Sequence, residues 1–190
     1  MRLYLIRHPQ PLVAPQTCYG RSDLGVDAAE LARVADALRG QLPPDAPLYS
    51  SPLQRCALLA DQLTQHGHPP PIRDARLAEL FFGDWEMRSW SDIPRDEVDA
   101  WAADLLHYRP GGGENLLQAA DRVRAFYQAL RWSRTGSAVV VCHAGTIRLL
   151  QQCGHRFALP DLALAAANHA HKIGYGEVRV LDFPASRFIV

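Results

Sequence analysis

Two adjacent residues near the N-terminus, Arg7 and His8, place a fixed positive charge beside a nucleophilic imidazole. A guanidinium can bind phosphoryl oxygens through paired hydrogen bonds, and a neutral imidazole can attack phosphorus. A second histidine, His143, follows the apolar run 138–142, and Gly145 comes two residues later. If a helix begins there, its first N–H groups would also face an anion. These residues indicate a site that handles a phosphorylated compound.

An arginine and a carboxylate complete the candidate chemistry. Arg55 falls in the first turn of an expected helix, close to the end of a short strand and to a positive helix terminus. Glu79 lies in the stretch L-A-E-L-F-F, and such apolar surroundings favour the uncharged carboxyl form, which can donate a proton. Asp84 and Glu86 are competing carboxylates in the same stretch.

The elements that must position these residues alternate along the chain. Strands are predicted at residues 2–7, 48–50, 138–142 and 177–183, with an edge strand at 187–190. Helices are predicted at 27–40, 52–65 and 114–133, and in part of 84–109. Another helix is predicted to begin near residue 146, and a helix that packs beside it is predicted to end before Pro160. This alternation predicts an α/β fold of three layers, in which helices cover both faces of a mostly parallel sheet. Ligands bind at the carboxyl ends of strands in such sheets, which is where Arg7, His8 and His143 fall.

Length and charge limit the function classes. The 190 residues suit one domain spanning residues 1–190, and the formal net charge of zero provides no basic field for nucleic acid or anionic lipid. No apolar run approaches the roughly 20 residues of a membrane span, and the N-terminus lacks a signal-peptide pattern, so we expect a cytoplasmic protein. The four scattered cysteines have no zinc-ligand spacing, and the pair His169 and His171 has no third ligand nearby. Both a monomer and a homodimer are compatible with the sequence.

The motifs, taken in order, resemble the histidine phosphatase superfamily, which includes the cofactor-dependent phosphoglycerate mutases. The resemblance spans roughly residues 2–150 and rests on four motifs. They are R-H at 7–8, S-x-x-x-R at 51–55, L-x-E with a downstream G-x-W-E across 77–86, and V-x-H-x-G at 141–145. The stretch T-C-Y-G-R-S-D-L at 17–24 and the short chain look most like the alpha-ribazole phosphatase branch.

This resemblance implies a role for each candidate. His8 would become phosphorylated, while Arg7, Arg55 and His143 would hold the phosphoryl oxygens. Glu79 would protonate the leaving alcohol and then help to activate water. Further substrate contacts are expected from Tyr19, Gly20 and Ala144. The substrate would be a small phosphorylated metabolite, with alpha-ribazole 5′-phosphate as the candidate, and neither a metal nor a cofactor is needed. A neutral His8 also needs a hydrogen-bond acceptor for its other ring nitrogen, for which we expect a backbone carbonyl.

Two positions depart from the family pattern. Pro9 replaces the glycine that follows the histidine, which removes an N–H group and either costs a phosphate-facing donor or stiffens the loop. Ala14 stands where the mutases carry an asparagine, which weakens a mutase-type phosphotransferase interpretation.

Two rival functions remain compatible with the sequence. Residues 142–148 fit C-x-x-G-x-x-R, the phosphate loop of cysteine-based phosphatases, with Cys142 as nucleophile. The chain could also bind a phosphorylated ligand without turnover. Specificity should come from residues 9–25 and 80–115, where Tyr19 and the tryptophans 85, 90 and 101 either line the pocket or pack in the core.

Overall fold

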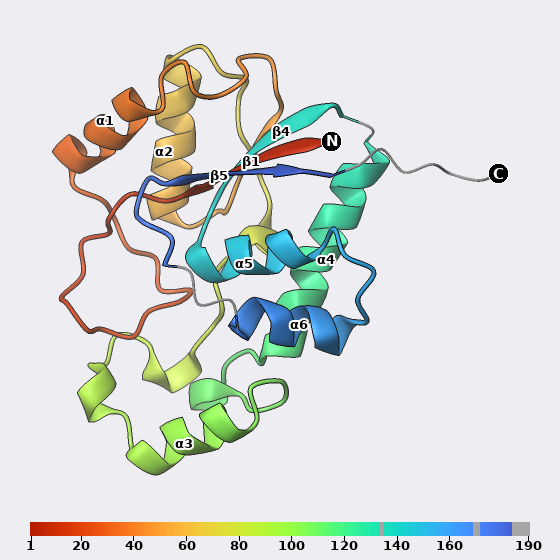
Figure 1. Ribbon diagram of the computed structural model, residues 1–190. Helices are drawn as coiled ribbons and strands as arrows, with labels where there is room; N and C mark the ends of the chain where they lie inside the picture. Colours follow the sequence, from red (N-terminus) through yellow and green to blue (C-terminus); the bar gives the residue numbers. More distant parts are fainter. Residues whose placement is uncertain (134, 169–171, 184–190) are drawn as a thin grey trace.

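Five strands form one mixed, mostly parallel sheet in the order β3-β2-β4-β1-β5 (Figure 1). The computed structural model describes residues 1–133, 135–168 and 172–183. The strands are β1 (Arg2–Arg7), β2 (Leu48–Ser50), β3 (Ile72–Arg73), β4 (Ser137–Cys142) and β5 (Val178–Asp182). Neighbouring strands are parallel except for β5, which runs antiparallel to β1.

Helices cover both faces of this sheet. They are α1 (Ala28–Ala37), α2 (Gln54–Gln65), α3 (Arg95–Ala103), α4 (Leu116–Trp132), α5 (Ala144–Gln152) and α6 (Leu159–Asn168). Because side chains alternate along a strand, Leu3 and Leu5 pack with α4, α5 and α6, whereas Ile6 packs on the other side with α1 and α2. The predicted three-layer α/β fold is therefore confirmed.

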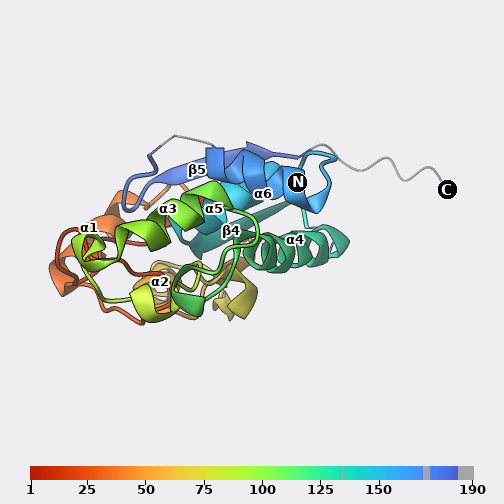
Figure 2. The ribbon, with the colours of Figure 1, turned by 90° about the horizontal axis from the view of Figure 1, so that it is seen from below.

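Helix α3 lies apart from the sheet, at the bottom of Figure 1 and in front in the view from below (Figure 2). Two segments join α3 to the rest of the chain, and they pass close to each other at glycine residues. Gly83 and Gly111 both have φ in the left-handed region, at 53° and 56°, and a Cβ on Gly83 would lie 1.9 Å from the Gly111 carbonyl oxygen. Only glycine permits this close crossing, which fixes the loop after Glu79.

Most predicted elements are confirmed, with shifts at their ends. Asp27 caps α1 through the N–H groups of Ala29 and Glu30, as expected. The prediction that a helix ends before Pro160 is wrong. Pro160 instead lies in the first turn of α6, a position that proline tolerates. The short β3 lies inside the predicted connection 66–76. The predicted edge strand 187–190 and the pair His169 and His171 fall outside the described residues.

The carboxyl ends of the three central strands meet at one edge. Arg7 pairs with Cys142, and Ser50 pairs with Val141 on the other side of β4. Just past these ends, His8 N donates to Cys142 O at 3.0 Å. The residues that follow β1, β2 and β4 therefore lie side by side. Among the described helices, none has the length and apolar character needed to cross a membrane.

Candidate active site

His8 is buried directly after β1 and has one ring nitrogen fixed by the backbone. Its Nδ1 lies 2.7 Å from the carbonyl oxygen of Pro9. A carbonyl can only accept, so Nδ1 carries the hydrogen and Nε2 keeps its lone pair. Burial and the positive charges of Arg55 and Arg7 hold the pKa of His8 well below its usual range. The expected carbonyl partner is confirmed, and the imidazole is neutral and available as a nucleophile.

Arg7 and Arg55 approach His8 with unused hydrogen-bond donors. Arg55 is fully buried and donates to the carbonyl oxygens of Ser22 at 2.7 Å and Gly20 at 2.5 Å. Arg7 donates to the carbonyl oxygen of Ile173. The Nε atoms of both arginines are buried and have no hydrogen-bond partner within the described part of the chain. Buried donors normally have acceptors, so these two atoms indicate a place for an anion.

Two tyrosines join the arginines to each other. The Tyr19 hydroxyl lies 2.9 Å from that of Tyr175. Tyr175 stacks under the Arg7 guanidinium at 3.9 Å, and Tyr19 faces Arg55 at 5.5 Å from the ring centroid. Burial and this hydroxyl contact raise the pKa of Tyr19 to about 12, so it is a neutral donor. No role for Tyr175 was predicted from the sequence, in which it is only an aromatic residue just before the strand predicted at 177–183.

His143 lies opposite His8, with the ring centroids 5.1 Å apart. It is buried, and its Nε2 lies 2.8 Å from the Ser51 hydroxyl oxygen. Burial, followed by the charges of His8 and Arg55, holds the pKa of His143 well below its usual range. A neutral His143 can hydrogen-bond a phosphoryl oxygen but adds no charge. The positioning contact from Ser51 was not predicted, although Ser51 begins the S-x-x-x-R motif.

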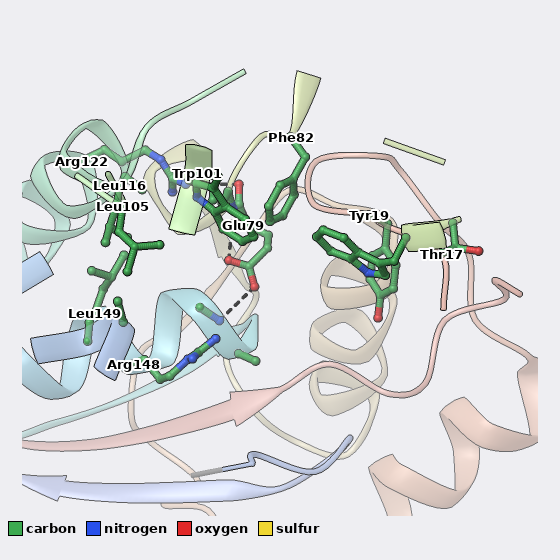
Figure 3. A pocket seen from close by; sticks show the side chains of 17 residues that line it. Thr17, Tyr19, Glu79, Phe82, Trp101, Leu105, Leu116, Arg122, Arg148 and Leu149 are labelled. Atoms are coloured by element: carbon green, nitrogen blue, oxygen red, sulfur yellow. Dashed lines mark hydrogen bonds between the residues drawn. The ribbon is translucent and has the colours of Figure 1, made fainter. Parts of the chain in front are cut away.

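Of the three carboxylates in the stretch 79–86, Glu79 lines a cavity of about 400 Å³ (Figure 3). Its Oε2 accepts from Gly145 N at 2.9 Å and its Oε1 accepts from Leu80 N at 3.1 Å. Asp84 is exposed to solvent. Glu86 is occupied elsewhere, because it accepts the backbone N–H groups of Arg21, Ser22 and Phe82 and the Ser22 hydroxyl. Glu79 is therefore the one of these three carboxylates that lines the cavity.

The cavity is largely apolar beyond Glu79. Aromatic side chains contributed by Tyr19, Phe82, Trp90 and Trp101 line it, and the two tryptophan rings stack at 6.2 Å with planes 10° apart. Trp85 instead belongs to a buried core cluster. Ala144 also lines the cavity, and its contact with the substrate stays a prediction.

Gly20 serves the site through its backbone. Its carbonyl oxygen accepts from Arg55, and a Cβ would lie 1.8 Å from Leu80 O. No larger residue fits there, and the predicted contact of Gly20 with the substrate stays a prediction beside this contact with Arg55.

Comparisons with known proteins agree with this geometry. The chain is 30% identical over 157 residues to the adenosylcobalamin/alpha-ribazole phosphatase of Escherichia coli (strain K12), covering 79% of this chain and 77% of that protein. The crystal structure of the alpha-ribazole phosphatase from Shigella flexneri superimposes with a TM-score of 0.78 at 25% identity, covering 96% and 90% of the two chains. A phosphoglycerate mutase structure from Thermus thermophilus superimposes with a TM-score of 0.72 at 26% identity, covering 97% and 94%.

The family model described as histidine phosphatase superfamily (branch 1) matches residues 3–188, which is nearly the whole chain. Its match includes all four motifs and every side chain that gathers at the carboxyl edge of the sheet. The phosphoglycerate mutase-like fold and the phosphatase class predicted from the motifs are thereby confirmed. The chain is a phosphatase that belongs to branch 1 of the histidine phosphatase superfamily.

Proposed function

We propose that the chain hydrolyses a phosphomonoester through a phosphohistidine formed on His8. The observation that carries this proposal is the state of the His8 ring, whose Nδ1 donates to Pro9 O and whose Nε2 keeps its lone pair. The unpaired Nε atoms of Arg7 and Arg55 supply charge-assisted donors for the phosphoryl oxygens. Phosphoryl transfer depends mainly on such charge stabilisation and on in-line placement.

The reaction then proceeds in two balanced steps. In the first, Nε2 of His8 forms a bond to phosphorus while the bond from phosphorus to the leaving oxygen breaks, and the Glu79 carboxyl gives its proton to that oxygen. In the second, water attacks phosphorus, the phosphorus–nitrogen bond breaks, and Glu79 takes a proton from the water. Arg7, Arg55 and His143 hold the phosphoryl oxygens throughout. Two easier displacements replace one difficult step.

The proposed substrate is alpha-ribazole 5′-phosphate, which carries an aromatic base on a phosphorylated sugar. Two observations support this choice. Tyr19, Phe82, Trp90 and Trp101 line the cavity beside Glu79, where a planar base can stack. The chain is also 30% identical to a protein named adenosylcobalamin/alpha-ribazole phosphatase.

The test compares the wild type with His8→Ala on 4-nitrophenyl phosphate and on alpha-ribazole 5′-phosphate. We expect phosphate release from both by the wild type, none above background by His8→Ala, and an acid-labile phosphoryl label on the wild type only. His107→Ala is the matched control, because His107 is an exposed histidine. Wild-type turnover without such a label, or retained turnover in His8→Ala, would contradict the mechanism. Turnover of the aryl phosphate alone would contradict only the substrate.

A cysteine mechanism has little support from the surroundings of Cys142. The thiol is fully buried, and burial raises its pKa well above the usual value, whereas a nucleophilic cysteine needs a lowered one. We expect Cys142→Ser to keep turnover. Loss of turnover in Cys142→Ser together with full turnover in His8→Ala would reverse the assignment.

Product analysis separates hydrolysis from phosphoryl transfer and from simple binding. A mutase-type phosphotransferase would move the phosphoryl group to a second alcohol, so inorganic phosphate would not accumulate. A binder without turnover would release no phosphate from the aryl ester between pH 4 and 8.

We also propose a cytoplasmic location, because all four cysteines are free thiols, as is usual in a reducing compartment. Cell fractionation tests this.

A further inference from the structure

The cavity beside Glu79 contains a cation that the proposed hydrolysis does not use. Arg148 lies on α5, one helical turn beyond Ala144 and Gly145, and lines the same cavity (Figure 3). Within residues 1–133, 135–168 and 172–183, nothing forms a hydrogen bond or an ion pair with its guanidinium. Its side chain is partly buried.

A second arginine in the cavity wall differs in this respect. Arg122 forms an ion pair with Glu114 at 2.7 Å and donates to the carbonyl oxygens of Arg76, Ala78 and Glu79. Its donors are thus committed to holding the Glu79 segment. Arg148 is the arginine in this wall whose donors have no partner among the described residues, so they can bind a ligand.

The walls near Arg148 are apolar. Leu105, Leu116 and Leu149 line the cavity with it, as do the aromatic side chains described above. A leaving group that fills this space displaces water from the guanidinium. A partly buried donor that loses water without gaining an acceptor costs free energy, whereas an oxygen acceptor on the ligand removes that cost. The cavity therefore favours a leaving group with an apolar or aromatic part and an oxygen acceptor.

The acceptor belongs to the leaving group and not to the transferred phosphoryl group. Glu79, Ala144 and Gly145 line the cavity together with Arg148, whereas His8 and Arg55 are not among its lining residues. Arg148 thus lies on the leaving-group side of the carboxylate.

We infer that Arg148 is a specificity-determining residue, which hydrogen-bonds an oxygen acceptor of the leaving alcohol between the scissile ester and the aromatic wall. This inference rests on the proposed hydrolysis at His8. The acceptor chemistry has two sources, a sugar hydroxyl and a carboxylate. Both accept hydrogen bonds from a guanidinium, and the carboxylate adds charge.

The experiment measures kcat/KM for three substrates with the wild type and with Arg148→Met. Alpha-ribazole 5′-phosphate provides sugar hydroxyls, phosphoserine provides a carboxylate, and phenyl phosphate provides neither. We expect Arg148→Met to lower kcat/KM for one of the first two by about tenfold more than for phenyl phosphate, mainly by raising KM. The substrate that suffers this loss identifies the acceptor. Arg148→Gln, which keeps a neutral donor, should lose less on a hydroxyl acceptor than on a carboxylate.

Arg156→Met is the matched control, because it removes the same charge from an exposed position nearby in sequence. Equal losses for all three substrates, or no loss for any, would overturn the inference, and thermal melting of each variant identifies a folding defect. Retained turnover in His8→Ala would overturn the proposed function instead. A further outcome separates the two proposals. If the wild type acts through His8 but Arg148→Met leaves the ratios of kcat/KM between the substrates unchanged, the proposed function stands and only the role of Arg148 is rejected.

Discussion

The Nδ1 atom of His8 lies 2.7 Å from the carbonyl oxygen of Pro9, the residue directly after it. This contact fixes the tautomer of the His8 ring through a backbone carbonyl oxygen, which every amino acid possesses. The residue at position 9 can therefore change without removing the acceptor. The tautomer of His8 does not depend on the N–H group that proline lacks, so both expected effects of the proline stay predictions.

Replacing Pro9 with glycine should leave catalysis nearly intact and lower stability. The carbonyl that accepts from His8 is retained, so we expect kcat/KM for an aryl phosphate within about threefold of the wild type. The free energy of unfolding should fall by about 1 kcal/mol, because glycine gives the unfolded chain more freedom. Steady-state kinetics and urea denaturation measure the two effects. A loss of activity above a hundredfold would show that the ring of proline itself positions His8.

The free energy of unfolding should depend on pH through the two buried histidines. An unfolded histidine titrates near pH 6.5, whereas the folded pKa values of His8 and His143 lie well below this. Below pH 6.5 the unfolded chain therefore binds more protons than the folded one, and stability falls as pH falls towards the folded pKa values. Each histidine contributes a slope of at most about 1.4 kcal/mol per pH unit below pH 6.5.

Urea denaturation from pH 7 to pH 5 checks this slope. His8→Asn removes one titrating group, so its slope should be smaller than that of the wild type, by at most about 1.4 kcal/mol per pH unit. Variant His107→Asn is the control for the removal of a histidine from an exposed position. Equal slopes for the wild type and His8→Asn would mean that His8 is protonated in the folded protein.

The positions of the main candidate residues could be predicted because they follow from local rules. His8 and His143 come directly after central parallel strands, and Arg55 lies in the first turn of a helix. Contacts between distant segments do not follow from such rules. Tyr19 and Tyr175 are 156 residues apart, and no periodicity in either segment indicates that their hydroxyls meet. Such pairs depend on how the loops fold over the sheet, and the spacing of residues along the sequence does not predict this.

Ser51→Ala should impair the site through His143. The change removes the hydroxyl that lies 2.8 Å from His143 Nε2 and frees the ring to rotate. We expect kcat/KM to fall by about tenfold, the equivalent of one hydrogen bond of about 1.4 kcal/mol. The His143 ring N–H resonance should also shift in NMR spectra. Ser50→Ala is the matched control, since Ser50 is equally buried but donates to the backbone carbonyl of Ser51. Equal kinetic effects in both variants would argue against a specific role for Ser51.

Glu86 should position Arg55 without touching the substrate. Its carboxylate accepts the backbone N–H groups of Arg21 and Ser22, and the carbonyls of Gly20 and Ser22 accept from Arg55. Glu86→Ala leaves this loop without its anchor. We expect a loss of stability of about 2 kcal/mol and a rise in KM for an aryl phosphate.

Thermal melting and steady-state kinetics together measure the effect of Glu86→Ala. Asp84→Ala is the control, because Asp84 is an exposed carboxylate two residues away. If Glu86→Ala loses stability while KM stays constant, the loop does not control Arg55.

An alanine at position 145 should displace the Glu79 carboxylate, because Gly145 lies directly against it. A Cβ at this position would lie 2.4 Å from Glu79 Oε1, closer than real contacts allow. Gly145→Ala must therefore push away the carboxylate that its own N–H group holds at 2.9 Å.

We expect kcat of Gly145→Ala to fall by about a hundredfold for an alkyl phosphate, within the range that positioned acid–base catalysis contributes. The loss should be smaller for 4-nitrophenyl phosphate, whose leaving group needs little protonation. Gly136→Ala serves as the control, because no atom lies within 4 Å of a Cβ there. A loss of the same size on both substrates would show that the alanine disturbs phosphoryl binding rather than the proton donor, since only proton transfer depends on the basicity of the leaving group.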